Sequence, residues 1–156
     1  MKKLSWEQTD KGFEELADKI KASGFKPDYI IGITTGGLIP LYFLAKKLNL
    51  DNILTVSASS YEKDKQKKLE ITYVPDRDLS NKKVLLVDEI VETGVSLKGV
   101  VEALTKKCNI GELKTATLAV NEDTCKFFPD FYAVSVHGEW LVFPWEQEDF
   151  PEYFSK

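Results

Sequence analysis

Hydrophobic residues along the chain follow two spacings, one typical of helices and one typical of buried strands. A capping box of Ser5 and Gln8 opens the first helical segment. The apolar positions that then recur at helical spacing are Phe13, Leu16, Ala17 and Ile20. Because Gly24 follows as a stop signal, the pattern predicts an amphipathic helix between Ser5 and Gly24.

Apolar runs and amphipathic segments alternate along the rest of the chain. The runs that predict strands are 29–33, 53–58, 69–74, 84–87, 115–120 and 132–136. Helical spacing after Pro40 and from about Ser96 predicts two further helices. Wholly apolar strands of this kind are buried on both faces. We therefore predict the α/β class, with a mainly parallel twisted sheet flanked by helices, in a single domain of residues 1–156.

Composition and charge narrow the possible partners. A chain of 156 residues can bury the core of one domain. Its net charge of -4 argues against nucleic acid as an obligatory partner. We expect no membrane partner and a cytoplasmic location, because the N-terminus turns polar at once and no apolar stretch is long enough to span a bilayer. Cys108 and Cys125 match no metal or redox spacing, so we expect both to be packed, reduced thiols.

Two polar loops are expected at the same edge of the predicted sheet. Thr34–Gly37 follows the strand at 29–33, and Asp88–Ser96 follows the strand at 84–87. In sheets of this class, ligands bind at the carboxyl ends of the strands. The pattern therefore predicts a ligand site at this rim.

The second loop has the chemistry of a phosphorylated-sugar site. Its strand is expected to end in the adjacent carboxylates of Asp88 and Glu89, which suit ribose hydroxyls or a hydrated Mg²⁺ ion. Glu92–Ser96 follows with a glycine and two hydroxyl side chains at the start of a helix, where N–H groups and the helix dipole favour an anion. The alternative is an ordinary strand-to-helix connection in which Thr93 and Ser96 merely cap the helix.

The string Val84–Leu97 resembles the phosphoribosyl-pyrophosphate motif of type I phosphoribosyltransferases. The shared order is four hydrophobic residues, two acids, two apolar residues, an acid, Thr-Gly, and then Ser or Thr. The resemblance extends over nearly the whole chain. Tyr29–Pro40 is similar to the strand and pyrophosphate loop of that family, and Ser59–Tyr61 with the charged run after it is similar to its flexible lid. Glu139–Glu146 resembles the purine-pocket segment of the xanthine-guanine and hypoxanthine phosphoribosyltransferases.

This resemblance implies a type I phosphoribosyltransferase fold with a flexible lid loop and a small C-terminal hood. It implies transfer of a phosphoribosyl group from phosphoribosyl pyrophosphate to a 6-oxopurine, with Mg²⁺ as cofactor and no partner other than these small molecules and further copies of the chain, as a homodimer or homotetramer. The residues that it assigns to phosphoribosyl pyrophosphate or the nucleotide are Thr35, Gly36, Gly37, Lys67, Asp88, Glu89, Ile90, Val91, Glu92, Thr93, Gly94, Val95 and Ser96.

Within that set the resemblance also implies individual roles. Glu92 corresponds to the carboxylate beside the purine N7, a candidate general base. Trp140 would stack on the purine and the Leu141 backbone would bind its edge. The residues assigned to Mg²⁺ are Asp88, Glu89 and, for a second ion, Glu146.

Three positions depart from the family pattern. Thr35 stands where relatives often carry a basic residue, and Glu92 is one methylene longer than the usual aspartate. Relatives also place a lysine after the strand at 115–120 that donates to the purine 6-oxo group, whereas Asn121 or Glu122 occupies that position here. Asparagine can still donate a hydrogen bond to a carbonyl, but an ionised glutamate cannot.

These departures leave an alternative in a different class, a non-catalytic or regulatory protein that binds phosphoribosyl pyrophosphate or a nucleotide on the same fold. A doubly wound domain phosphorylated at its acidic strand end is a third reading. The strand at 115–120 ends in Val120 and Asn121 rather than in the lysine which that reading needs. His137 has no acid or serine partner at a suggestive spacing, so we expect it to be structural or on the surface.

Overall fold

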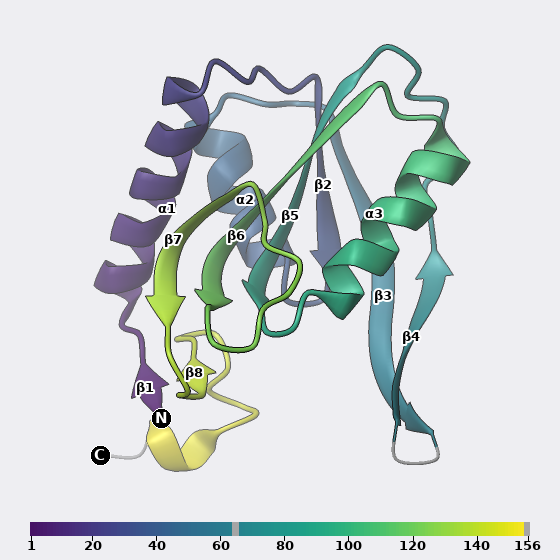
Figure 1. The fold of residues 1–156 in the computed structure, drawn as a ribbon. Helices are drawn as coiled ribbons and strands as arrows, with labels where there is room; N and C mark the ends of the chain where they lie inside the picture. The colour runs from purple at the N-terminus through teal and green to yellow at the C-terminus, as the bar shows by residue number, and fades with distance from the viewer. Residues whose placement is uncertain (64–65, 155–156) are drawn as a thin grey trace.

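The computed structural model describes residues 1–63 and 66–154, with side chains described for all of these except 62, 63 and 66. A six-stranded sheet in the order β4-β3-β2-β5-β6-β7 forms its centre (Figure 1). The strands are β2 (Tyr29–Thr34), β3 (Ile53–Lys63), β4 (Gln66–Tyr73), β5 (Lys83–Val91), β6 (Glu112–Asn121) and β7 (Phe131–Val136). All neighbouring pairs are parallel except β3 and β4, which confirms the predicted mainly parallel sheet.

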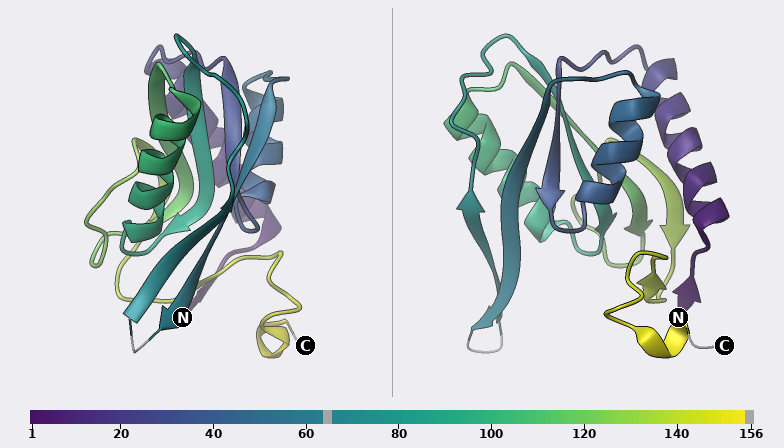
Figure 2. Two further views of the ribbon diagram at one scale, coloured as in Figure 1. Left: turned by 90° about the vertical axis from the view of Figure 1, so that its right-hand side faces the viewer. Right: turned by 180° about the vertical axis from the view of Figure 1, so that it is seen from behind.

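Helices cover both faces of this sheet, as predicted. The helices are α1 (Trp6–Ala22), α2 (Leu38–Lys47) and α3 (Val95–Cys108). Figure 2 shows α1 and α2 on one face and α3 on the other. The capping box at the start of α1 is present, because Ser5 Oγ accepts the Gln8 N–H at 3.1 Å and Gln8 Oε1 accepts the Ser5 N–H at 2.8 Å.

The four buried residues Val84–Val87 of β5 alternate between the two helical layers. Val84 and Leu86 pack in the cluster that contains Leu97, Val100 and Leu104 of α3. Leu85 and Val87 pack in the cluster that contains residues of α1 and α2. Side chains leave a strand on alternate faces, so successive residues of this stretch join opposite layers. The alternation does not extend to the end of β5, since Val91 packs in the cluster of α3.

Two expected boundaries are wrong. We expected β5 to end before Asp88, but it continues to Val91 and stays paired with β6 up to the Val91–Val120 pair. We also expected strands at 53–58 and 69–74 with a charged run between them, but β3 and β4 continue into this polar segment as an antiparallel hairpin. The hairpin arms can be polar because antiparallel pairing satisfies the backbone while side chains face solvent. The expected flexible lid is therefore a hairpin over the described residues, and its tip at 64–65 lies outside them.

The C-terminal segment returns to the N-terminus. β1 (Lys2–Lys3) pairs in parallel with β8 (Leu141–Val142), and the 3₁₀ helix η1 (Pro151–Tyr153) follows. This small unit lies beyond the carboxyl ends of β5 and β6, across from the β3–β4 hairpin (Figure 1). Among the described residues, no helix is both long and apolar enough to cross a bilayer.

Candidate active site

The carboxyl end of β5 sends its two adjacent acids to opposite sides of the sheet. Following the alternation of the strand, Asp88 leaves on the side of α3 and Glu89 on the side of α2. Each acid lines a different cavity. We expected the two carboxylates to face a shared partner at a strand end. Because the strand continues through both residues, the structure instead divides them between two sites.

The first cavity, here called the α3 cavity, has a volume of about 260 Å³. Its lining residues are Ser60, Lys67, Asp88, Ile90, Val91, Glu92, Thr93, Gly94, Ser96 and Leu97. The fold thus brings most of the predicted phosphoribosyl-pyrophosphate residues together around one hollow. Lys67 reaches it from the β3–β4 hairpin, so a basic side chain faces a cavity whose other charged residues are the acids Asp88 and Glu92.

The amino end of α3 opens onto this cavity. Its N-cap residue is Gly94, with φ at 87°, which has no side chain to cap the helix. The Thr93 hydroxyl accepts the Val95 N–H at 3.4 Å, so Thr93 makes a long hydrogen bond to the first turn, as the alternative reading expects. A Cβ atom at Gly94 would lie 2.6 Å from the Phe127 carbonyl oxygen, so both the dihedral angle and the space require glycine. A helix start that lines a cavity suits an anion.

The carboxylate of Asp88 is held in an environment that disfavours its charge. Burial, together with the neighbouring charge of Glu89, raises the pKa of Asp88 to about 7, against the hydrogen bond from the Glu89 N–H to Asp88 Oδ1 at 2.8 Å. A cation or hydroxyl groups entering the α3 cavity would favour the charged form, so the site is suited to binding them.

The second cavity, the α2 cavity, has a volume of about 380 Å³ and holds three acids. Its lining residues are Thr35, Gly36, Leu38, Ile39, Glu89, Trp145, Glu146 and Asp149. Trp145 Nε1 donates to Glu89 Oε2 at 2.8 Å. Burial raises the pKa of Glu89, the Trp145 hydrogen bond opposes the rise, and the charges of Glu146 and Asp149 add to it. Burial likewise raises the pKa of Glu146, against a hydrogen bond from the Phe143 N–H.

The loop between β2 and α2 forms the other wall of the α2 cavity. A Cβ atom on Gly36 would lie 2.4 Å from Cδ of Glu89, so only glycine lets the loop approach that carboxylate. We expected Thr35, Gly36 and Gly37 all to offer N–H groups to a pyrophosphate. The prediction is wrong for Gly37, whose N–H donates to the Ile33 carbonyl at 2.8 Å as the chain turns into α2.

Neither cavity is a preformed metal cage. Over residues 1–63 and 66–154, no three Asp, Glu, His or Cys side chains are placed to hold a metal ion. Mg²⁺ does not need such a cage, because it keeps several waters and is commonly bound through one or two carboxylates and the phosphates of a substrate. The oxygen donors of Asp88 on one side, and of Glu89 and Glu146 on the other, fit that mode.

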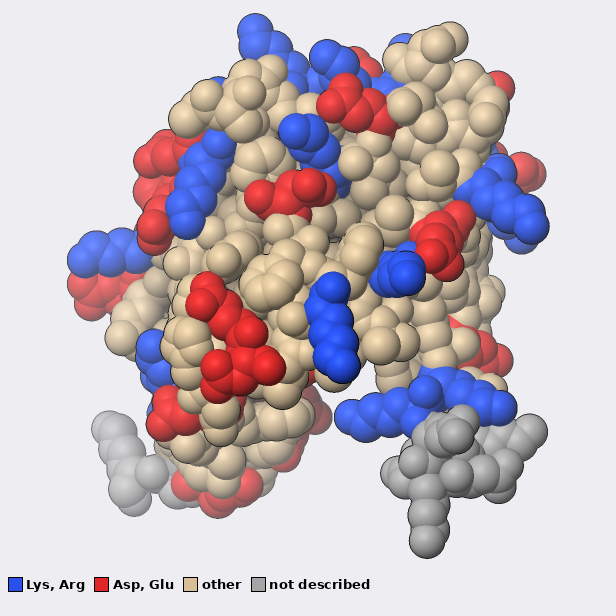
Figure 3. All heavy atoms as spheres, in the orientation of Figure 1, with Lys and Arg blue, Asp and Glu red and all other residues tan. Residues whose placement is uncertain are grey.

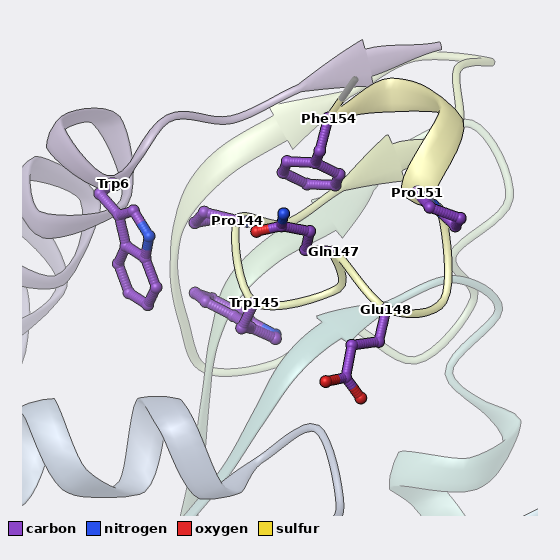
Figure 4. Close-up of a pocket in the computed structure, with 7 residues that line it drawn as sticks. All are labelled: Trp6, Pro144, Trp145, Gln147, Glu148, Pro151 and Phe154. Carbon is purple, nitrogen blue, oxygen red and sulfur yellow. The ribbon is translucent and has the colours of Figure 1, made fainter. Parts of the chain in front are cut away.

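The predicted purine-binding residues lie outside both cavities. Trp140 is 53% exposed, and its ring centroid lies 6.4 Å from that of Phe150. Leu141 is buried in β8. The carbonyl groups of its two neighbours, Trp140 and Val142, accept the N–H groups of Lys2 and Leu4. A third hollow of about 810 Å³ lies between Trp6 and the C-terminal segment (Figure 4). Trp145 lines both this hollow and the α2 cavity.

The structure decides which residue stands beside Glu92 at the end of β6. Asn121 Nδ2 donates to Glu92 Oε2 at 2.9 Å. Glu122 points away and accepts hydrogen bonds from the Tyr132 and Ser135 hydroxyl groups. The His137 side chain is exposed and lies beside Glu122 and Asp123, which confirms the predicted surface position.

Comparison with known proteins agrees with this geometry. The family model described as the phosphoribosyl transferase domain matches residues 4–151. The chain belongs to the phosphoribosyltransferase family. Curated xanthine-guanine phosphoribosyltransferases are among the relatives of this phosphoribosyltransferase. The protein from Desulfotalea psychrophila is 30% identical over 93% of this chain and 86% of its own length, and the protein from Idiomarina loihiensis is 28% identical over 92% and 85%.

Solved structures show the same fold. A purine phosphoribosyltransferase from Pyrococcus horikoshii is 36% identical, with a TM-score of 0.80 over 92% of each chain. The xanthine-guanine-hypoxanthine phosphoribosyltransferase of Helicobacter pylori is 26% identical, with a TM-score of 0.85 over 99% of each chain. The predicted type I fold is therefore confirmed.

Several cavity residues of this phosphoribosyltransferase were not predicted from the sequence. Ser60 lies within the segment similar to the family lid but had no assigned role, and its hydroxyl lies 3.0 Å from that of Ser96. Trp145 and Asp149 join the α2 cavity without having been predicted. Trp145 stands next to Glu146 in the purine-pocket resemblance, which is the signal that could have drawn attention to it.

Proposed function

We propose that this phosphoribosyltransferase transfers the phosphoribosyl group of phosphoribosyl pyrophosphate to a 6-oxopurine, namely xanthine, guanine or hypoxanthine. The products are the purine nucleoside monophosphate and pyrophosphate. The observation that carries the proposal is the α3 cavity, which Asp88, Glu92 and the start of α3 line together. Relatives whose names specify xanthine-guanine or purine substrates support the choice of base.

The donor would bind across the carboxyl end of β5. Its 5′-phosphate would lie at the start of α3, against the backbone and hydroxyl groups of Thr93–Ser96. Asp88 would bind ribose hydroxyls, and Lys67 would close over the charged donor from the hairpin. The pyrophosphate would face the N–H groups of Thr35 and Gly36 in the α2 cavity, which places the β5 strand between the two phosphate sites.

Glu92 would act as the general base. A purine nitrogen forms a bond to the anomeric carbon, while the bond from that carbon to pyrophosphate breaks and leaves its electron pair on the departing oxygen. Positive charge develops on the ribose in between, close to Asp88 and Glu92. The carboxylate of Glu92 would take the proton that the purine loses as it becomes a nucleotide.

Magnesium would be held by Asp88 on the α3 side and by Glu89 and Glu146 on the α2 side. When bound, the ion neutralises charge on the departing pyrophosphate. Trp140 would stack on the purine, and the Leu141 backbone would bind its edge. The homodimer or homotetramer expected from the resemblance stays a prediction, as does a cytoplasmic location.

Incubation of the purified protein with phosphoribosyl pyrophosphate, Mg²⁺ and each of adenine, guanine, hypoxanthine and xanthine tests the proposal. Nucleotide formation with a 6-oxopurine is expected, together with release of one pyrophosphate for each nucleotide. Protection against thermal unfolding by the donor, without turnover of any base, would overturn the proposal and support a binding protein in its place. A matched reaction without Mg²⁺ tests the cofactor assignment.

A further inference from the structure

Trp145 is held in place by aromatic rings that come from both ends of the chain. Its ring stacks on Phe143, with 4.7 Å between the centroids and an interplanar angle of 5°. Phe13 of α1 lies 6.4 Å away at an angle of 19°, and Trp6 at the start of α1 lies 5.9 Å away (Figure 4). Phe13 and Phe143 are buried. The indole therefore rests against close-packed core rings, which restrict its reorientation.

The turn that carries Trp145 is closed by hydrogen bonds between the residues on either side of it. The Glu146 N–H donates to the Phe143 carbonyl at 3.1 Å, and the Phe143 N–H donates to Glu146 Oε2 at 2.8 Å. The Glu146 carbonyl also accepts the N–H groups of Asp149 and Phe150, at 3.1 and 3.0 Å. Since both the backbone and the ring are held, the direction of the indole N–H is set as well.

This N–H points at a carboxylate of the α2 cavity. Trp145 Nε1 donates to Glu89 Oε2 at 2.8 Å. The other oxygen, Oε1, is among the atoms nearest to the position that a Cβ atom on Gly36 would take. Glu89 is thus confined between an indole of the C-terminal segment and the loop between β2 and α2.

The group that holds Glu89 carries no charge of its own. Among the described residues, no Lys or Arg lines the α2 cavity, and its other charged residues are Glu146 and Asp149. A lysine or arginine partner would fix the carboxylate but would also neutralise it. An indole N–H occupies one acceptor site and leaves the negative charge available to a cation.

We propose that Trp145 is a positioning residue, whose indole N–H holds the Glu89 carboxylate where it receives pyrophosphate together with Mg²⁺. The proposal rests on the proposed function, which puts pyrophosphate in the α2 cavity. Trp145 acts through Glu89 and takes no part in the transfer itself. Without the indole donor the carboxylate keeps its charge but loses its fixed position, so the affinity for pyrophosphate falls.

Titration with pyrophosphate in the presence of Mg²⁺ measures this affinity by calorimetry, without a purine and without turnover. We expect Trp145→Phe, which keeps a ring and removes the donor, to raise the dissociation constant about fivefold. Glu89→Ala should raise it about 30-fold, since it removes the carboxylate itself. Trp6→Phe is the matched control and should leave it unchanged, because Trp6 packs on the same indole but lines neither the α2 nor the α3 cavity.

The double variant separates positioning from a merely structural role. In the Glu89→Ala background the indole has no carboxylate to hold, so adding Trp145→Phe should change the dissociation constant by less than about 1.5-fold. An equal loss in both backgrounds would overturn the proposal, because the indole would then affect the cavity without Glu89. Melting temperatures establish that the variants are folded.

Heteronuclear NMR of the indole N–H groups gives a second readout on the unmodified protein. Trp145→Phe and Trp6→Phe assign the signals. The Trp145 signal should shift when pyrophosphate and Mg²⁺ are added, whereas the Trp6 signal should not. Binding of pyrophosphate without a shift of the Trp145 signal would overturn the proposal even if a variant fails to fold.

Failure of the proposal and failure of the proposed function have different signatures. A loss of pyrophosphate affinity that depends on Glu89, without turnover of any base, removes the enzyme and keeps the role of Trp145. Turnover of a 6-oxopurine with equal losses in the two backgrounds keeps the enzyme and overturns the role of Trp145. Absence of pyrophosphate binding to the unmodified protein also overturns it.

Discussion

The α3 cavity and the α2 cavity are built from the same strand but hold their acids differently. Asp88, in the α3 cavity, has one hydrogen bond within the described residues, and it comes from the backbone N–H of the next residue. Glu89, in the α2 cavity, accepts the indole N–H of Trp145 and has Glu146 and Asp149 nearby. One acid is therefore open to a ligand, whereas the other is already fixed by the C-terminal segment.

The difference shows how one strand supplies a carboxylate to each of two cavities. Consecutive residues of a strand project to opposite faces, so a pair of adjacent acids supplies one carboxylate to each cavity. The surroundings also differ in charge. In Figure 3, basic side chains gather on the β3–β4 hairpin and acidic ones on the C-terminal segment. The α3 cavity receives Lys67 from the hairpin, while the α2 cavity receives Glu146 and Asp149.

The largest expected difference between the two cavities is the loss of activity when each acid is neutralised in turn. We expect Asp88→Asn to lower kcat/KM by about 10²–10³-fold, because the open carboxylate is the one that meets developing positive charge. Glu89→Gln should cost about tenfold, since the amide can still accept the Trp145 hydrogen bond. Steady-state kinetics at saturating Mg²⁺ measure both. Equal losses would show that the two acids do the same work.

Gly36→Ala tests the close approach in the α2 cavity. The new methyl group would meet the Glu89 carboxylate at 2.4 Å and displace it, and a displacement near 1 Å costs about 100-fold in rate. Gly12→Ala is the matched control, because its methyl group would meet the end of the Leu118 side chain at 2.6 Å, away from both cavities. The control should change the melting temperature and leave kcat unchanged. Full activity of Gly36→Ala would contradict the packing of the loop on Glu89.

The free energy of unfolding should depend on pH because the pKa of Asp88 is raised in the folded protein without a ligand. The pKa of Asp88 is raised to about 7 in the folded protein from its ordinary value of 3.8, so the folded state binds more protons between these values. The contribution of Asp88 is therefore greatest below the unfolded pKa and is lost as the pH rises through 7. Without Mg²⁺ or donor, we expect a loss of about 2–3 kcal/mol between pH 5 and pH 8 from this group.

Urea unfolding at a series of pH values measures this loss. The raised pKa values of Glu89 and Glu146 act in the same direction, so the difference between the parent and Asp88→Asn isolates Asp88. The variant should be the more stable of the two at pH 8. Identical pH profiles for the two proteins would contradict the burial of this carboxyl group.

The smallest expected effect comes from the hydrogen bond that fixes Glu89. Trp145→Phe keeps an aromatic ring against Phe143 but removes the indole donor. We expect a loss of about 1 kcal/mol in the free energy of unfolding at neutral pH. Trp6→Phe is the control, since Trp6 is exposed and its indole nitrogen has no hydrogen-bond partner in the described part of the chain. Equal destabilisation by both changes would attribute the loss to packing alone.

Local sequence patterns were enough to predict the class of fold and the loop from Asp88 to Ser96. Apolar runs predicted β2, β5 and β6 because strands buried on both faces need continuous hydrophobic residues. The capping box predicted the start of α1 because its two hydrogen bonds are local. The loop from Asp88 to Ser96 was predicted as one unit because its residues are close in the chain, and all of them except Glu89 and Val95 line the α3 cavity.

Contacts between segments that are distant in the chain became known only from the tertiary structure. The sequence placed Asp88 and Glu89 side by side, but the continuation of β5 beside β6 sends them to different cavities. It left Asn121 and Glu122 as equal candidates, and the packing of the segment after β6 on Gly94 brings the Asn121 amide to Glu92. Trp145 reaches Glu89 across 56 positions of the chain. Local patterns carry no information about such pairs, because they depend on how the strands are ordered and on which face each side chain emerges.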